Sequence, residues 1–289
     1  MSWQTNISDI TRRLFHLLES HEMSDVTLIV GENEERYPTH SWLLSMYSEV
    51  FYAMFYGPMA EKKRDILLPN DDQKAVSIFI NYIYTDKIVI RSIEEAIHGL
   101  HFAEKYMITF MKEQCLLYLT KYISSDTVLE IYETAALLQQ NELTTKCWNY
   151  IVNNASEIIK HDSVKNVKYE TILKIVSEDN LTLQSELDMY NAVIKWGKER
   201  FQDQSPGDLR KNLEPLLQQI RFLSMTSAEF AESPCQDGIL THDEQIDIFR
   251  EISTSKTYDS NNILDQWRKR REAVKSRKVY QCPTYVLYQ

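Results

Sequence analysis

The chain has 289 residues, of which 43% are hydrophobic and 26% are charged, and this is enough for one large domain or two ordinary ones. The balance is typical of a folded protein and argues against long disordered segments. The formal net charge of −10 disfavours general binding to nucleic acids or anionic lipids, because most of the surface would repel phosphates.

The first 90 or so residues predict short strands mixed with helices. An amphipathic helix is expected from Ser8 to Glu22, because apolar residues recur there at helical spacing: Ile10, Leu14, Leu17 and Leu18. The β-branched run from Ser24 to Gly31 predicts a strand. Further strands are expected at Arg36–Tyr37, before Pro38, and at 65–69, with two short helices between them at 40–45 and 49–56.

Beyond Asn70 the pattern is almost entirely helical. Helices are expected at 73–84, 93–106, 108–121, 128–140, 143–153, 169–176, 186–199, 209–219 and 226–231. The short connections between them are typical of packed antiparallel helices. We therefore predict a small α+β domain over residues 1–122, an all-α domain over 123–252 and a basic tail over 253–289.

The basic tail stands out from the acidic remainder of the chain. Its segment from Trp267 to Lys278 holds seven basic residues and one acidic residue. A solvated basic helix is the favoured interpretation, while a nuclear-import signal or a contact with an acidic partner stays open.

Motifs for catalysis or cofactor binding are missing. No Gly-x-Ser-x-Gly elbow occurs, and six glycines form neither a Walker loop nor a dinucleotide-binding turn. His98 and His101 lie three apart on one expected helix, but their apolar neighbours favour a packed helix over a metal site. His40 is expected to be buried and hydrogen-bonded. We expect no enzymatic activity, no cofactor and no metal.

From the cysteines and the absence of long apolar runs we expect a soluble, cytoplasmic protein, with an additional nuclear location as the open alternative. Cys115, Cys147, Cys235 and Cys282 lack any Cys-x-x-Cys spacing and are expected to be reduced thiols. No stretch approaches the roughly 18 apolar residues that a membrane span needs.

Several short motifs resemble, in order and spacing, those of a BTB/POZ domain over residues 8–122. They are Ser24-Asp25-Val26, Pro38-x-His40, Phe51-x-x-Met54-Phe55, Met59-x-Glu61 and Tyr82-Ile-Tyr84-Thr85-Asp86. Residues 123–252 resemble the BACK domain that commonly follows BTB, through Ala135–Leu138, Leu143–Ile151 with Asn154, Ser185-Glu186 and Tyr190–Trp196. The chain is most similar to BTB–BACK proteins that end in a PHR β-sandwich, although the residues after Ile252 are too few to build one.

The resemblance implies binding to cullin-3, because the family's contact motif falls on Met59-Ala60-Glu61. Met59 would insert as a flexible apolar side chain, and Glu61 would accept hydrogen bonds. On the preceding helix, spacing places Val50, Phe51, Met54 and Phe55 on an inward face, where all four are expected to be core residues. The tyrosines Tyr52 and Tyr56 are expected on the opposite face. The two tyrosines are expected at the interface, with ordinary partial burial as the alternative. Gly57-Pro58 would end this helix and present Met59 and Glu61 beside them.

The resemblance also implies a homodimer. Its interface is expected to use Ile10, Leu14, Leu17 and Leu18 of the first helix, which could equally pack within one chain.

Our hypothesis is a substrate-recruiting adaptor of a cullin-3 ubiquitin ligase. Its protein substrate is unknown. The alternative is an oligomerising scaffold or transcriptional co-regulator whose basic tail directs nuclear entry.

Overall fold

A computed structural model describes residues 3–60, 63–202, 204–254, 265–269 and 271. The chain divides into two compact units, which we call unit 1 (residues 1–123 and 134–144) and unit 2 (residues 124–133 and 145–289). All strands in the described ranges lie in unit 1, so the expected succession of an α+β fold and an all-α fold is confirmed.

Unit 1 combines a small sheet with a set of helices. The strands are β1 (Val26–Val30), β2 (Glu35–Thr39) and β3 (Asp65–Leu68). The helices are α1 (Trp3–Asn6), α2 (Ile10–Ser20), α3 (Ser41–Tyr47), α4 (Glu49–Tyr56), α5 (Gln73–Thr85), α6 (Ile93–Lys105) and α7 (Thr109–Lys121). Two further helices, α8 (Val128–Leu137) and α9 (Asn141–Asn153), each belong partly to unit 1 and partly to unit 2.

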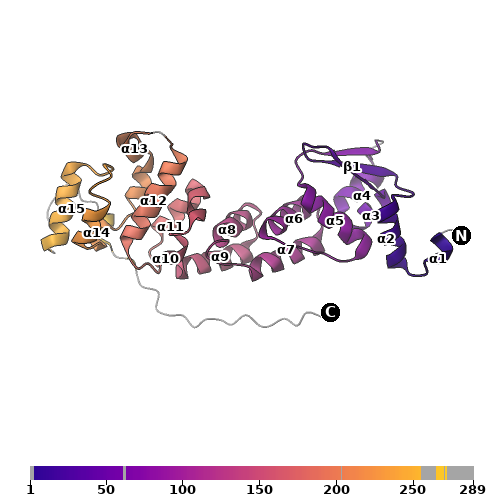
Figure 1. Ribbon diagram of the computed structural model, residues 1–289, viewed down its shortest axis with the longest axis horizontal. Coiled ribbons are helices and arrows are strands. Elements are labelled where there is room, and N and C mark those ends of the chain that lie inside the picture. The colour runs from indigo at the N-terminus through magenta and orange to yellow at the C-terminus, as the bar shows by residue number, and fades with distance from the viewer. Residues whose placement is uncertain (1–2, 61–62, 203, 255–264, 270, 272–289) are drawn as a thin grey trace. The chain divides into compact units, whose positions relative to one another are not determined.

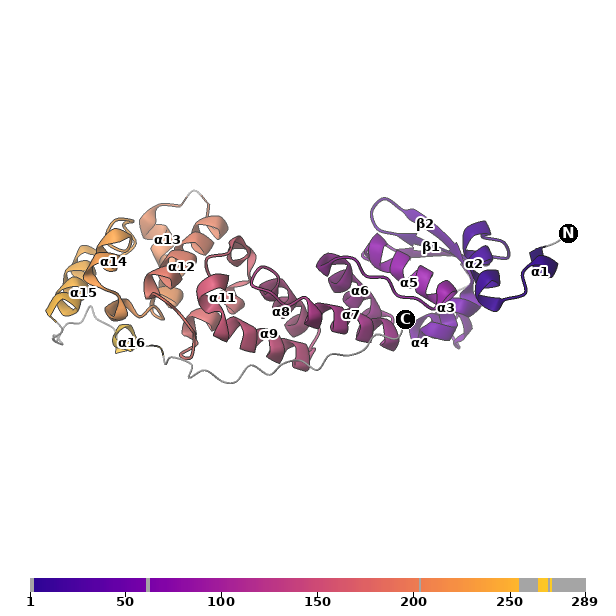
Figure 2. The same cartoon turned by 60° about the horizontal axis from the view of Figure 1, so that its bottom comes forward.

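The sheet has the strand order β2-β1-β3, with β1 antiparallel to β2 and parallel to β3. Figure 1 shows it lying over helices α3 to α5, and Figure 2 shows β2 beside β1. We expected the second strand to end before Pro38, but β2 continues through Pro38 to Thr39. An edge strand tolerates proline, because it pairs on one side only and does not need every N–H for the ladder.

Phe51 on α4 is the centre of the aromatic core in unit 1. It is fully buried, and its ring stacks on Tyr106 and Phe79 with centroid distances of 4.7 and 5.9 Å. The other expected core residues of α4, Val50, Met54 and Phe55, are only half-buried. The prediction that all four lie in the core is therefore wrong for three of them, because this short helix buries a single position fully.

Several buried polar side chains of unit 1 form a connected network. His40 is buried as expected, and its Nδ1 and Nε2 atoms lie 2.5 Å from the Tyr84 hydroxyl and 3.0 Å from the Glu22 carbonyl oxygen. The Tyr84 hydroxyl also lies 3.0 Å from Thr39 Oγ1. Burial raises the pKa of Tyr84, so the hydroxyl stays neutral.

Unit 2 is helical throughout its described part. After α8 and α9 it contains α10 (Ala155–Ile158), η1 (Asp162–Asn166), α11 (Tyr169–Ser177), α12 (Glu186–Arg200), α13 (Pro206–Leu217), η2 (Phe222–Ser224), α14 (Ser227–Glu232), α15 (His242–Thr254) and α16 (Asp265–Arg268). Figures 1 and 2 both show α12 beside α13 and α14 beside α15. Gly197 allows α12 and α13 to approach closely, since a Cβ atom there would lie 2.7 Å from a methyl carbon of Leu213.

Two sequence-based predictions in unit 2 need correction. We did not predict α15, because its apolar residues form no continuous inward face: Ile248 is buried, whereas Ile246 and Phe249 are exposed. The solvated interpretation of the basic tail is wrong for its described residues Trp267 and Arg271, which are both buried or nearly so. No helix within the described ranges is both long and apolar enough to cross a bilayer.

Candidate protein-binding surface

Helix α4 presents two aromatic side chains to solvent, as expected. Tyr52 is 57% exposed and Tyr56 is 53% exposed, and their rings lie 6.0 Å apart. Ser48 caps the helix by accepting a hydrogen bond from the Phe51 N–H at 3.1 Å. The same hydroxyl donates to the carbonyl oxygen of Tyr106, so the start of α4 is fixed to the core and its tyrosines point outward.

Tyr56 is held by a small polar network at the start of α3. Its hydroxyl lies 3.1 Å from Ser41 Oγ. Ser41 in turn donates to the Asp25 carboxylate, through its hydroxyl at 2.5 Å and its backbone N–H at 2.8 Å. Asp25 therefore satisfies an N–H at the start of α3, and Ser41 orients the tyrosine on α4.

Helix α4 ends at Gly57, a position where a side chain would not fit. Its φ of −71° is open to any residue, but a Cβ atom would lie 2.3 Å from the carbonyl oxygen of Ala53. Met59 follows and is 94% exposed. Glu61, the remaining predicted contact residue, lies outside the described residues.

Sequence reasoning missed two apolar residues on the neighbouring helix. Trp42 and Met46 are exposed on α3, which packs against α4, while Leu43 and Leu44 are buried. The i, i+4 spacing of Trp42 and Met46 was the signal that could have found them, since residues four apart share one helix face. We call the set Trp42, Met46, Tyr52, Tyr56 and Met59 the α3–α4 surface. Such a group of exposed aromatic and methionine side chains is typical of protein-binding surfaces.

The four residues predicted to form the dimer interface lie on α2. Ile10 is exposed, and Leu14, Leu17 and Leu18 are half-buried. No residue of α2 is fully buried, although the helix packs against α5. Its apolar side is thus only partly covered within its own chain, and its use in a dimer stays a prediction.

The histidines and cysteines that the structure describes were candidates for a metal site or a nucleophile. His98 Nδ1 lies 3.1 Å from Asp72 Oδ2, close enough for an ion pair, but the two groups are not aligned for a hydrogen bond. No cluster of three or more metal-binding side chains occurs in the part of the chain that the structure describes. Burial raises the pKa of the Cys115 and Cys147 thiols to about 12, so both are poor nucleophiles at neutral pH.

Known proteins resemble this chain in both halves. The BTB/POZ domain family model matches residues 14–123, and the BACK (BTB And C-terminal Kelch) model matches residues 128–233. BTB/POZ domain-containing protein 3 of Mus musculus is 29% identical over 261 residues, which cover 88% of this chain and 49% of the relative. BTB/POZ domain-containing protein 6 of Xenopus tropicalis is 28% identical over 254 residues, covering 86% and 48% respectively.

The chain spans about half the length of these relatives. The two family models lie in sequence order, one on the α+β fold and the other on the helices that follow. The chain therefore belongs to the BTB–BACK family.

Proposed function

We propose that this protein is a non-enzymatic adaptor that binds cullin-3 through the α3–α4 surface and brings a protein substrate to a cullin-3 ubiquitin ligase. BTB–BACK domains are typical of such adaptors. The single observation that supports the site is the exposure of Tyr52, Tyr56 and Met59 on and just after one short helix, where buried side chains would be expected of residues this apolar.

The chemistry of this surface suits an amphipathic helix of the partner. Tyr52 and Tyr56 offer large rings that lose little side-chain entropy on binding, and each keeps a hydroxyl for a hydrogen bond. Met59 offers an unbranched apolar side chain that can adapt to a pocket. Glu61 is proposed to accept a hydrogen bond at the edge of the same contact.

Isothermal titration with the N-terminal region of cullin-3 tests the assignment. We expect Met59→Asp to lower the affinity by at least about 30-fold, as for a hot-spot residue. Ile246→Asp is the matched control, because Ile246 is also an exposed apolar residue but lies on α15 in unit 2. Equal affinities for wild type and Met59→Asp would contradict the proposed contact.

The charged part of the contact needs its own pair of variants. Glu61→Lys should weaken cullin-3 binding, whereas Glu32→Lys, at an exposed position between β1 and β2, should not. The two variants change net charge equally, so a difference between them cannot come from long-range electrostatics alone.

Homodimerisation through α2 is the second part of the proposal. The helix lies beside an open groove of about 700 Å³ lined by Phe15 on α2, Tyr37 on β2 and Val89, among others. Light scattering at micromolar concentration should give the mass of a dimer for the wild type, and Leu14→Asp or Leu17→Asp should give monomers or insoluble protein. Ile10→Asp is the milder variant, because Ile10 is exposed. A monomeric wild type would contradict the proposed dimer.

The alternative is an oligomerising scaffold without a ligase role. Pull-down from a cell extract separates the two, because only the adaptor should recover cullin-3. Proximity labelling would then be compared between wild type and Met59→Asp. Because loss of cullin-3 binding should block turnover of the substrate, the substrate should be a protein that is enriched in the Met59→Asp sample. A fluorescent fusion would test the proposed cytoplasmic location.

A further inference from the structure

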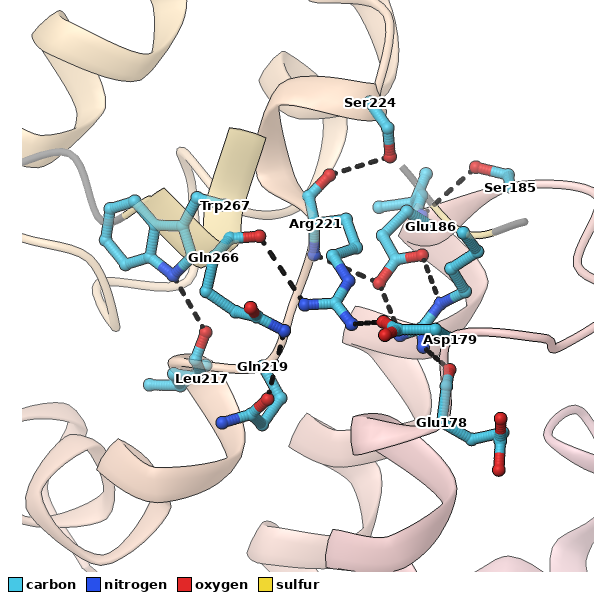
Figure 3. Close-up of polar contacts among 12 residues, drawn as sticks. Glu178, Asp179, Ser185, Glu186, Leu217, Gln219, Arg221, Ser224, Gln266 and Trp267 are labelled. Atoms are coloured by element: carbon cyan, nitrogen blue, oxygen red, sulfur yellow. Dashed lines mark hydrogen bonds and ion pairs between the residues drawn. The ribbon is translucent and has the colours of Figure 1, made fainter. Parts of the chain in front are cut away.

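Residues 265–269 and Arg271 lie against the rest of unit 2 and are held there by one tryptophan and two arginines. Figure 3 shows the centre of this region, with Trp267 next to Leu217 and with Gln266 between Trp267 and Arg221. The helix α16 within this segment has only four residues. A helix this short is unstable by itself, so its contacts with unit 2 must hold it in place.

Trp267 is the apolar anchor of the segment. It is 2% exposed, and its ring packs edge-on against Phe222 with the centroids 5.0 Å apart. Its indole N–H donates a hydrogen bond of 3.1 Å to the carbonyl oxygen of Leu217 (Figure 3). Buried indoles need such a partner, so this bond fixes both the depth and the orientation of the ring.

Arg268 pairs with a carboxylate on α15. Its Nη2 atom lies 2.7 Å from Glu251 Oε1, and its Nε atom lies 3.3 Å from Glu251 Oε2. The side chain of Glu251 is almost fully buried. A buried carboxylate requires ionic or hydrogen-bonding partners, and the two-pronged contact supplies both.

Arg271 makes the second two-pronged contact. Its Nε and Nη2 atoms lie 2.9 and 2.8 Å from the two carboxylate oxygens of Glu186, at the start of α12. The two side chains are 6% and 4% exposed. Arg271 also donates to the carbonyl oxygen of Glu178, and Glu186 accepts the backbone N–H of Arg221 at 3.0 Å.

The side chain of Arg221 lies between these contacts and is completely buried. It donates to Asp179 and reaches the backbone oxygen of Gln266 at 3.5 Å (Figure 3). Burial, followed by the nearby charge of Arg271, lowers the pKa of Arg221. The carboxylates of Asp179 and Glu186 offset the repulsion between the two guanidinium groups.

We propose that residues 265–269 and Arg271 form an intramolecular clasp, which binds a seat on the rest of unit 2 formed by Glu178, Glu186, Leu217, Phe222 and Glu251. The seat recognises the pattern Trp-Arg-x-x-Arg, with an aromatic site for the first residue and a carboxylate for each arginine. The folded part of unit 2 thus extends to Arg271, well beyond the residues matched by the BACK model. This inference does not depend on cullin-3 binding.

The clasp changes the role of the basic tail. Two of the seven basic residues between Trp267 and Lys278, Arg268 and Arg271, are engaged by carboxylates of the same chain. A basic signal that needed all seven residues would have to compete with the seat for these two.

Cleavage of the folded full-length chain tests the clasp directly. Residues 256–261 are replaced by the recognition sequence of a site-specific protease, and the cut protein is passed over a size-exclusion column. The fragment that begins at residue 262 should co-elute with the remainder, because Trp267 and the two arginines hold it without a covalent link. Separate elution of the fragment would overturn the proposal.

Hydrogen exchange on the uncut chain provides an independent test. Trp267→Ala should raise exchange of the amides between Leu217 and Ser224 by about tenfold or more, since these amides lie at the seat. Lys269→Ala is the matched control, because Lys269 is exposed in the same segment. Unchanged exchange in both variants would contradict the clasp even if the cleavage site could not be cut.

Discussion

The two units differ in where they keep their large apolar side chains. Among the described residues, every exposed large apolar side chain belongs to unit 1 except Ile246 and Phe249. Unit 2 instead encloses most of its apolar groups and several charges, including Glu251 and the pair Arg271–Glu186. Unit 1 leaves much of its apolar surface available to partners, while the seat of unit 2 is occupied by a segment of its own chain.

The buried polar groups of the two units also differ, because most are neutral in unit 1 and several are charged in unit 2. Unit 1 buries mainly neutral groups, such as the linked side chains of Thr39, His40 and Tyr84. Unit 2 buries carboxylates and guanidinium groups, whose burial is tolerated only while each keeps its partner. Loss of one clasp residue should therefore disturb unit 2 more than loss of one exposed aromatic disturbs unit 1.

The largest expected effect concerns the core of unit 1. Phe51→Ala should lower the free energy of unfolding by roughly 3–5 kcal/mol, because it removes a buried ring and leaves a cavity beside Phe79 and Tyr106. Urea denaturation measures this. A loss below about 1 kcal/mol would mean that α4 contributes little to the core.

The neighbouring residue should behave in the opposite way. Tyr52→Ala should reduce cullin-3 affinity by about 2 kcal/mol, while the free energy of unfolding changes by less than about 0.5 kcal/mol. Titration and urea denaturation of the same sample measure both. A large loss of stability without a change in affinity would identify Tyr52 as a structural residue.

A smaller effect is expected from the clasp. Arg268→Met should lower the stability of unit 2 by about 1.5 kcal/mol, at the low end for charged hydrogen bonds because the side chain is partly exposed. Lys269→Met should change it by less than about 0.5 kcal/mol. Equal losses of stability for the two variants in urea denaturation would mean that Arg268 contributes no more than a solvated residue of the tail.

The hydroxyl of Tyr56 should contribute least. Tyr56→Phe removes its contact with Ser41 Oγ and should cost about 0.5–1 kcal/mol. Thermal unfolding of this variant is compared with that of Tyr52→Phe as the control. A cost of several kcal/mol would mean that Ser41 and Asp25 depend on Tyr56 for their own positions.

Two buried thiols allow the units to be followed separately, with Cys115 in unit 1 and Cys147 in unit 2. In a Cys235→Ser/Cys282→Ser background, neither should react with an alkylating reagent at pH 8 until its unit unfolds. Because burial raises each folded-state pKa from 9.0 to about 12, the neutral thiols stabilise the fold below pH 9, and this contribution is lost as the pH rises toward 12. Rapid labelling of native protein would contradict the burial.

Sequence reasoning succeeded where one element depends on local signals. The strand from Ser24, the helix ending at Gly57 and the outward tyrosines all follow from periodicity and turn residues close in sequence. It failed for Val50, Met54 and Phe55, because helical spacing says which residues share a face but not how deeply that face is covered.

The prediction of a solvated basic tail was wrong for a different reason. Trp267 and Arg271 look like part of a solvated basic run, because their partners Phe222 and Glu186 lie far away in the sequence. The spacing of Trp42 and Met46 places them on one face of α3, but only the fold shows that this face is exposed. Long-range pairing is the information that a single sequence does not display.

The division of α8 and α9 between the units has a consequence for how this chain can be cut or recombined. Residues 134–144 pack with unit 1 although they follow the start of unit 2, and Gln140 donates a hydrogen bond to Glu104. A fragment that stops at Ile123 would keep the whole BTB match and still lack this part of its packing. An exchange of domains at that junction would take residues 134–144 away from unit 1, so a recombined chain should keep these residues together with residues 1–123.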